Sequence, residues 1–381
     1  MNAEQILERL IAHPTVSHRP NGALIDDICE LLDAPGVLIE RHDELDDRAN
    51  VLVRIGPEPD GTRGGLLLSG HLDVVPADEP GWYSDPFKLT RRDLDGHLVA
   101  RGAADMKGFV ALVVALARAL RSRTLRQPLM LLFTRDEETG TRGARAFAES
   151  YSGEALPRAA IIGEPTGLEV VRAHKGHLGL ELDIAGRSAH SGYPHLGVNA
   201  IEIAGRAIGA LSQLTRELAS ERPQHAMLFP EVPYVPLNIG TIHGGAATNV
   251  VPDRCVLALG LRPLPGVSAD ALEARVRDVL AAALPADAYR LTRTSDSPPL
   301  LSPEDASIHR CLVEVMQQRG ERAVSYATDA GWLQSLGVQC VIWGPGRIEV
   351  AHRPNEALDP EQLRCCGELL LPIVERFCEV R

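Results

Sequence analysis

Two adjacent glutamates follow an apolar run near the middle of the chain. The segment LMLLFTRDEETG, residues 129–140, starts like a buried strand and ends with Asp136, Glu137 and Glu138. Side chains alternate across a strand, so neighbouring carboxylates point to opposite sides while the chain stays extended. The glutamates therefore belong either to a solvated loop or to a site that uses two carboxylates in different roles. We interpret Asp136 as a turn or cap residue.

A histidine and an aspartate follow another apolar run. In LLLSGHLDVVP, His71 and Asp73 are two residues apart, which puts them on the same side of an extended chain. His71 could bind a metal through one ring nitrogen while Asp73 hydrogen-bonds the other nitrogen or holds a neighbouring ligand. A polar loop without a site is the alternative.

Three more residues of metal-binding type lie in loops. Asp105 is in RGAADMKG, Glu164 is in GEPTG, and His352 follows the glycine-rich GPGRIEVA. Each has a simpler explanation by itself. Asp105 could be a helix N-cap, Glu164 a solvated side chain and His352 a structural histidine.

Their joint placement favours a metal site. His71, Asp105, the Glu137–Glu138 pair, Glu164 and His352 each follow or flank an apolar strand. Open α/β sheets bind ligands at the carboxyl ends of their strands. Two histidines and three carboxylates suit two divalent metals that share a carboxylate, with Zn(II) favoured and Co(II) or Mn(II) as substitutes. One glutamate of the pair would remain free as a base, but the residues alone do not say which.

The elements that would position these residues follow from periodicity. Helices are expected over 2–12, 22–33 and 107–122, with buried strands between helices, which predicts a mixed α/β sheet covered on both faces. Residues 178–296 instead alternate like half-exposed strands around two helices, which predicts a four-stranded α+β domain. We therefore expect an α/β catalytic domain made of residues 1–177 and 297–381, with an α+β domain inserted at 178–296.

Composition narrows the class of protein. The 381 residues carry a formal net charge of -12, which makes nucleic acid an unfavourable partner. Seven scattered cysteines without a CxxC pair fit a reducing compartment. The first residues do not resemble a signal peptide, and no apolar run approaches the roughly 20 residues that span a membrane. We expect a cytoplasmic protein without a membrane partner.

The motifs together resemble those of the dinuclear-zinc aminoacylase and deacetylase family of metallopeptidases. SGHLDVVP, ARGAADMKG, DEETG, GEPT, and GPG followed by AHRPNE occur in the family's order over nearly the full chain. The resemblance implies two zinc ions per subunit, with Co(II) or Mn(II) as substitutes. Asp105 would bridge both ions and Asp73 would orient His71. Glu137 would be the general base and later the proton donor. The other implied ligands are His71 and Glu164 for one ion, and Glu138 and His352 for the other.

The predicted inserted domain also contains family-like segments, including AGRSAHSGYPHLGVNAI and LNIGTIHGGAATNVVPD. The resemblance implies that His190 reaches the partner subunit's active site and stabilises the oxyanion, which requires a homodimer formed through the inserted domain. It also implies that Asn249, Arg262 and the backbone at Gly346 hold the substrate carboxylate or the oxyanion. Turn and surface polar residues are the alternative for these three.

Within the family, GWYSDPF, GEPTGLEVVRAHKGH and GPGRIEVAHRPNE resemble the acetylornithine deacetylase branch. That branch implies hydrolysis of N2-acetyl-L-ornithine to L-ornithine and acetate, a step of arginine biosynthesis. Asp329, in YATDAGWLQ, stands where the branch usually has glutamate, and a contact with the substrate's distal amine would alter specificity. Alternatives are deacylation of acetylcitrulline, acetyl-diaminobutyrate, succinyl-diaminopimelate or another N-acyl amino acid, a metallo-dipeptidase, and a metal-bound carrier.

Overall fold

The chain folds into two compact units. The computed structural model describes residues 1–59, 61–153 and 155–380. Unit 1 comprises Met1–Arg172, Leu301–Arg322 and Thr328–Arg381, and unit 2 comprises Ala173–Leu300 and Ala323–Ala327. Unit 2 contains the segment 178–296, for which the sequence predicts an inserted domain, and extends beyond it at both ends.

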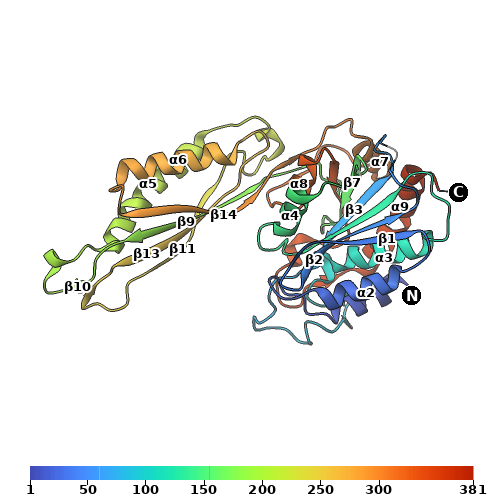
Figure 1. Ribbon diagram of the computed structural model, residues 1–381, viewed down its shortest axis with the longest axis horizontal. Helices are drawn as coiled ribbons and strands as arrows, with labels where there is room; N and C mark the ends of the chain where they lie inside the picture. Colours follow the sequence, from blue (N-terminus) through green and yellow to red (C-terminus); the bar gives the residue numbers. More distant parts are fainter. Residues whose placement is uncertain (60, 154, 381) are drawn as a thin grey trace. The chain divides into compact units, whose positions relative to one another are not determined.

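Unit 1 is built on a six-stranded mixed sheet in the order β1-β2-β6-β3-β7-β17 (Figure 1). Strands β6, β3, β7 and β17 run parallel to one another, whereas β2 pairs antiparallel with β6 on one side and with β1 on the other. The predicted mixed α/β fold is confirmed. The strands are β1 (Val37–Leu45), β2 (Arg48–Ile55), β3 (Leu66–His71), β6 (Leu129–Thr134), β7 (Ala159–Ile162) and β17 (Gln339–Ile342).

Helices cover this sheet. Helix α3 packs against α1, α2, α9 and strand β3, while α4 contacts α8, β1 and β2. Among the described residues, no helix combines the length and apolar character needed to cross a bilayer. The helices of unit 1 are α1 (Ala3–Ile11), α2 (Gly22–Leu32), α3 (Gly108–Leu120), α4 (Arg142–Ser150), α7 (Ser307–Met316), α8 (Ala330–Ser335) and α9 (Pro360–Cys378).

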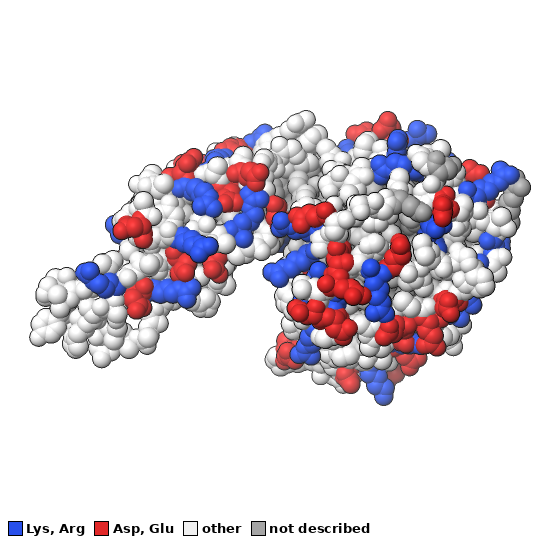
Figure 2. Space-filling view, in the orientation of Figure 1, with Lys and Arg blue, Asp and Glu red and all other residues white. Residues whose placement is uncertain are grey.

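Short elements complete unit 1. Strands β4 (Thr90–Arg91), β5 (Leu98–Val99) and β18 (Ala357–Leu358) form a small sheet, and a single helical turn η4 (Ile348–Val350) follows β17. On the face of unit 1 seen in Figure 2, basic and acidic side chains are intermixed. That face offers no continuous basic stripe of the kind that binds nucleic acid.

Unit 2 contains a four-stranded antiparallel sheet in the order β11-β13-β9-β14. Its helices α5 (Ala200–Ser220) and α6 (Ala269–Ala283) pack against each other, and α5 contacts three of the strands (Figure 1). Cys255, Leu257, Leu259 and Leu261 are buried at alternate positions of β13, as expected for a sheet covered on one face. The strands are β9 (His177–Ala185), β11 (Leu237–Gly244), β13 (Arg254–Leu261) and β14 (Tyr289–Ser297).

The remaining elements are short. Strands β10 (Ala189–His190) and β12 (Val250–Val251) pair with each other, and β15 (Leu300–Leu301), β8 (Ala173–His174) and β16 (Ala323–Val324) form a small sheet. Two single helical turns, η2 (Pro194–Leu196) and η3 (Ala226–Leu228), lie in the connections of unit 2.

Candidate metal centre

The parallel strands of unit 1 bring the predicted metal ligands to one edge of the sheet. Strand β3 ends at His71, β6 is followed within four residues by Glu138, and β7 is followed within two residues by Glu164. Because these strands run in the same direction, their carboxyl ends meet. Asp105 lies in the π-helical turn η1 (Ala103–Lys107) before α3, and His352 follows β17 and η4.

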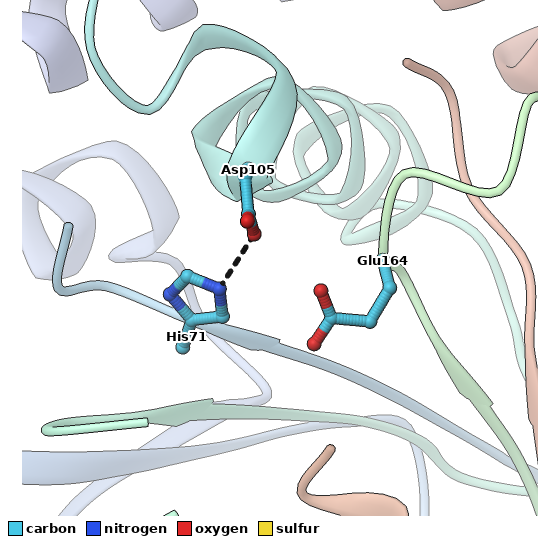
Figure 3. Close-up of side chains that lie close together, drawn as sticks. All are labelled: His71, Asp105 and Glu164. Carbon is cyan, nitrogen blue, oxygen red and sulfur yellow. Dashed lines mark hydrogen bonds and ion pairs between the residues drawn. The ribbon is translucent and has the colours of Figure 1, made fainter. Parts of the chain in front are cut away.

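These five side chains form two ligand groups that share one carboxylate. His71, Asp105 and Glu164 make the first group (Figure 3), and Asp105, Glu138 and His352 make the second. Within each group the candidate ligand atoms lie within 4.8 Å of one another. Asp105 Oδ1 is 3.0 Å from His71 Nε2, and its Oδ2 is 3.3 Å from His352 Nε2. Asp105 therefore presents one oxygen to each histidine, as a bridging ligand would.

The negative charges of the carboxylates in the centre are not fully compensated by neighbouring positive charges. Burial, followed by the charge of Asp105, raises the pKa of Glu164 well above its usual value and that of Glu138 to about 7. The hydrogen bonds that His352 donates to Asp105 and then to Glu138 raise the pKa of His352 to about 10, so its imidazolium acts as a counter-charge. Burial would raise the pKa of Asp105, but hydrogen bonds from His352 and His71 lower it. Clustered desolvated carboxylates with imidazole nitrogens fit divalent metals that accept N and O ligands.

Glu137 lies beside this centre but belongs to neither ligand group. Burial, and then the charge of Glu164, raises the pKa of Glu137 well above its usual value. Its main-chain N–H donates to Asp73 Oδ1 at 2.9 Å. A carboxylate with increased proton affinity next to a metal centre has the properties of a general base.

Asp73 connects His71 to the turn that carries the two glutamates. His71 Nδ1 lies 2.8 Å from the main-chain oxygen of Asp73 and 3.8 Å from its carboxylate. The carboxylate accepts N–H bonds from Glu137 and Glu138, at 2.9 and 3.3 Å, and a 2.6 Å bond from Ser17 Oγ. In this geometry the main chain of Asp73 contacts the histidine, while its side chain holds the main chain of Glu137 and Glu138 in place.

Asp136 lies in the turn after β6, and its side chain is buried. It is 1% exposed. Its Oδ2 accepts bonds from Arg48 Nη1 at 2.6 Å and Arg135 Nη1 at 2.7 Å, and its Oδ1 accepts the His18 N–H at 3.0 Å. Two guanidinium groups thus fix the residue that directly precedes Glu137.

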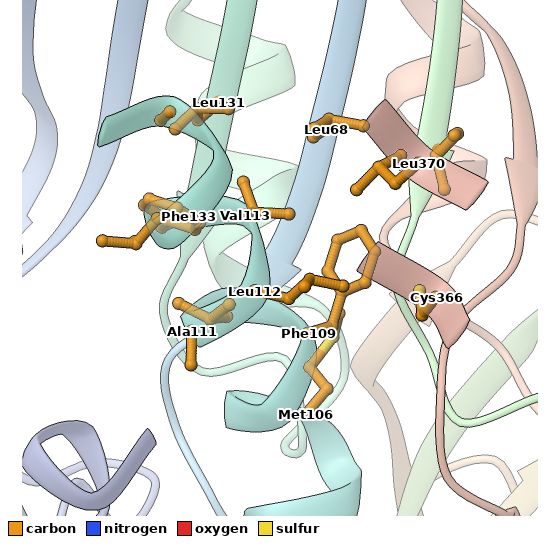
Figure 4. Packing of buried hydrophobic residues seen from close by; sticks show 14 of the residues in the cluster. Leu68, Met106, Phe109, Ala111, Leu112, Val113, Leu131, Phe133, Cys366 and Leu370 are labelled. Carbon is orange, nitrogen blue, oxygen red and sulfur yellow. The ribbon is translucent and has the colours of Figure 1, made fainter. Parts of the chain in front are cut away.

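A glycine allows the end of β7 to approach the core. A Cβ added to Gly163 would lie 1.9 Å from the ring of Phe109. Phe109 belongs to α3, where it packs with Met106, Leu112, Leu370 and Cys366 (Figure 4). The close contact places Glu164, the next residue along the chain, beside the turn that carries Asp105.

Two other predicted site residues lie in unit 1. Asp329 is 2% exposed and accepts a 2.5 Å bond from Thr134 Oγ1, and its Oδ1 is buried without a hydrogen-bond partner in the described part of the chain. Burial raises its pKa to about 6.

Gly346 has φ 92°, its N–H donates to Gln362 Oε1, and a Cβ there would meet Ala104 at 3.1 Å. Gly346 therefore borders the Asp105 turn, with its N–H engaged by Gln362.

The remaining predicted residues, His190, Asn249 and Arg262, belong to unit 2. His190 is exposed in β10, and its Nδ1 accepts the Gly192 N–H at 3.0 Å. Asn249 is exposed, and its main-chain oxygen accepts the Ser191 N–H. Arg262 is partly buried and adds its charge to burial in lowering the pKa of His177 to about 4.

Sequence reasoning missed two side chains that contact the site, Ser17 and Glu356. Ser17 Oγ donates to Asp73, and buried Glu356 accepts the N–H of Asp105 at 3.0 Å. No periodicity or spacing identifies either residue, because each contact joins segments more than 50 residues apart. For Glu356 the one signal was its place at the end of the AHRPNE motif.

Sequence comparison gives an independent result. Residues 67–376 match the model of peptidase family M20/M25/M40. The chain is 39% identical to an acetylornithine deacetylase of Klebsiella pneumoniae (strain 342), covering 98% of this chain and 97% of the relative. It is 38% identical to an acetylornithine deacetylase of Proteus mirabilis (strain HI4320), covering 98% and 96%.

Solved structures share the fold at lower identity. An M20 metallo-carboxypeptidase of Sulfolobus solfataricus, Sso-CP2, superposes with a TM-score of 0.79 at 17% identity, covering 99% of both chains. A dinuclear metal-binding M20 peptidase of Bacillus subtilis, YXEP, superposes with a TM-score of 0.66 at 17% identity, covering 99% of this chain and 98% of that one. At such identities the likeness establishes the fold alone.

Proposed function

The chain belongs to peptidase family M20/M25/M40 and is a hydrolase of that family, and from this premise we propose that it hydrolyses the amide of an N2-acyl amino acid. The observation that carries the proposal is the pair of ligand groups sharing Asp105, with Glu137 beside them and outside both. A binding protein would not need a half-buried carboxylate at that position that is outside both ligand groups. We propose N2-acetyl-L-ornithine as the substrate.

Two divalent metals would occupy the centre, with Zn(II) favoured by the mixed nitrogen and oxygen donors. His71 and Glu164 would hold one metal, Glu138 and His352 would hold the other, and Asp105 would contact both. When bound, such metals lower the pKa of water and polarise an amide carbonyl. The raised pKa values of Glu138 and Glu164 support this proposal, because divalent cations would supply the missing positive charge.

Glu137 would move the proton. It takes a proton from the attacking water and returns it to the departing amine, and its raised pKa suits both steps. Asp73 keeps it in place through the Glu137 N–H, while the main-chain oxygen of Asp73 orients His71.

The substrate proposal is supported by the relatives named acetylornithine deacetylase, which match this chain over almost its full length. Asp329 is our candidate for the residue that favours a cationic side chain, because its Oδ1 is buried and lacks a partner among the described residues. Asn249, Arg262 and the backbone of Gly346 are proposed contacts for the substrate carboxylate or the oxyanion, on the family resemblance.

We also propose a homodimer formed through unit 2, in which His190 serves the partner's site. Large apolar side chains are exposed around β10, η2 and β12, including Tyr193, Leu196 and Val250. The end of unit 2 that carries β10 is almost free of charged side chains in Figure 2. Exposed apolar patches of this kind mark protein interfaces.

A substrate panel tests the function. The metal-loaded protein is assayed for amine release from N2-acetyl-L-ornithine, N2-acetylcitrulline, N2-acetyl-diaminobutyrate, succinyl-diaminopimelate and a set of dipeptides. We expect the highest kcat/KM on N2-acetyl-L-ornithine. Cleavage of dipeptides without hydrolysis of acetylornithine would show that the protein is a dipeptidase and not a deacetylase. Inactivity on every substrate of the panel would contradict the proposed hydrolase and favour a binding role.

A further inference from the structure

A buried glutamate that the proposed mechanism does not use contacts the turn that carries Asp105. Glu356 is 1% exposed, follows His352 by four residues and directly precedes β18. It belongs to neither ligand group. An ionised carboxylate at such depth costs several kcal/mol unless hydrogen bonds and an opposite charge compensate it.

Glu356 receives four hydrogen bonds from the segment that carries Asp105. Its Oε1 accepts the N–H groups of Ala104 at 2.9 Å and Asp105 at 3.0 Å. Its Oε2 accepts the N–H of Gly102 at 3.1 Å and Nη1 of Arg101 at 2.9 Å. Arg101 is itself 1% exposed, so the compensating charge is buried as well.

The turn depends on these bonds because its own backbone does not supply them. Gly102 has φ 81°, and Asp105 has φ -121° and ψ 91°, which are not helical values. The N–H groups of a non-helical segment need acceptors from elsewhere in the chain when they are buried. Glu356 supplies the acceptors for three of them, including the N–H of Asp105 itself.

We propose that Glu356 is a positioning residue that fixes the main chain of Asp105, so that this one carboxylate presents an oxygen to each metal. This inference rests on the proposed dinuclear function. Glu356 and His352 lie on one short segment, so the same stretch of chain holds a ligand of the second group and the anchor of the shared ligand. A shift of this segment would change both groups together.

The alternative is that Glu356 only stabilises the fold through Arg101. Glu79 separates the two roles, because it also accepts a bond from Arg101, through Nη2, and is not bonded to the N–H groups of Gly102, Ala104 or Asp105. Glu79→Gln therefore disturbs the arginine without releasing the turn. It is the matched control for Glu356→Gln, which replaces one acceptor oxygen by an NH2 donor that faces N–H groups.

The test is a Co(II) titration of the full-length protein, followed by the visible absorption spectrum and by kcat and KM. We expect Glu356→Gln to weaken the apparent affinity for Co(II) about 10- to 100-fold, to alter the spectrum and to lower kcat more than it changes KM. Glu79→Gln should retain the affinity and the spectrum of the wild type.

Wild-type affinity, spectrum and kcat in Glu356→Gln would overturn the positioning role, as would equal losses in both variants. If Glu356→Gln does not fold, Glu356→Asp withdraws the same carboxylate by one methylene, and unchanged Co(II) affinity in that variant would also overturn it. A wild-type protein that binds no Co(II) would instead overturn the proposed function on which this inference depends.

Discussion

Glu137 and Glu138 are neighbours in the chain, yet only Glu138 joins a ligand group. Glu137→Gln removes the proposed base and keeps the shape of the side chain. We expect kcat on the best substrate to fall about 100- to 10,000-fold, because general-base catalysis contributes a factor of this size. Two metals per chain should remain by elemental analysis.

The matched control is Glu149→Gln on α4, which changes an exposed glutamate that pairs with Arg145. It should keep full activity. Full activity in Glu137→Gln would exclude the assigned base, and loss of metal in that variant would mean that Glu137 is a ligand.

Because His352 is protonated in the metal-free site, we expect metal binding to depend on pH. In the metal-free site its pKa is about 10, because Asp105 and Glu138 stabilise the imidazolium, so it carries a proton at pH 7. A metal ligand must be neutral, so binding releases this proton and apparent affinity weakens as pH falls below about 10. Calorimetry in buffers of different ionisation enthalpy measures the release.

His352→Ala should release fewer protons per metal than the wild type. An observed binding enthalpy that is the same in every buffer would show that no proton is released, and it would contradict the role of His352 as a ligand.

At the scale of single residues, the sequence identified the candidate metal ligands but not the contacts that hold them in place. His71, Asp105, Glu138, Glu164 and His352 were identified from their positions after apolar runs, and the structure brings them together. The division of roles within the glutamate pair came from the family resemblance. The contact of Glu356 with Asp105 joins positions 251 residues apart, and no local pattern encodes such a pairing.

The turn between β6 and α4 is the element that carries Glu137, the proposed base, and Asp136 anchors this turn. Asp136→Asn keeps the left-handed backbone at φ 52° but removes the charge shared by Arg48 and Arg135. We expect the free energy of unfolding, measured with urea at pH 7, to fall by about 3 kcal/mol, as when one partner of a buried ion pair is removed.

This loss should itself depend on pH. The pKa of Asp136 is lowered in the folded protein, because the His18 N–H, Arg135 and Arg48 outweigh the effect of burial. Its stabilisation is therefore present above the unfolded pKa of about 4 and is lost as pH falls below it, so the two proteins should converge in acid. Asp46→Asn is the control, since Asp46 is exposed and 3.7 Å from Arg48, and a loss equal to that of Asp136→Asn would contradict the anchor.

Strands were predicted correctly where every side chain of the strand is buried, as in β6. The apolar run LMLLFT became β6. Strand β1 was missed because VLIERHDEL is an edge strand with mostly exposed or half-buried side chains, and charged residues interrupt its alternation. The sheet order, with β6 between β2 and β3, depends on long-range pairing that a local pattern does not contain.

At the scale of the whole molecule, the apolar end of unit 2 predicts the oligomeric state. Leu196 is 57% exposed there, and in a symmetric dimer each substitution acts twice. Leu196→Glu should convert the proposed dimer into a 41.2 kDa monomer, as measured by sedimentation equilibrium. Leu94→Glu, at a residue that is 90% exposed in unit 1, should stay dimeric. A wild-type monomer, or equal masses for both variants, would contradict an interface through unit 2.

The number of metals per chain tests the shared centre most directly. The wild type and Asp105→Ala are dialysed against Zn(II), and the bound metal is counted by elemental analysis. Because Asp105 belongs to both ligand groups, we predict two metals in the wild type and fewer than one in Asp105→Ala. One metal or none in the wild type, or two metals retained by Asp105→Ala, would contradict a dinuclear centre bridged by this carboxylate.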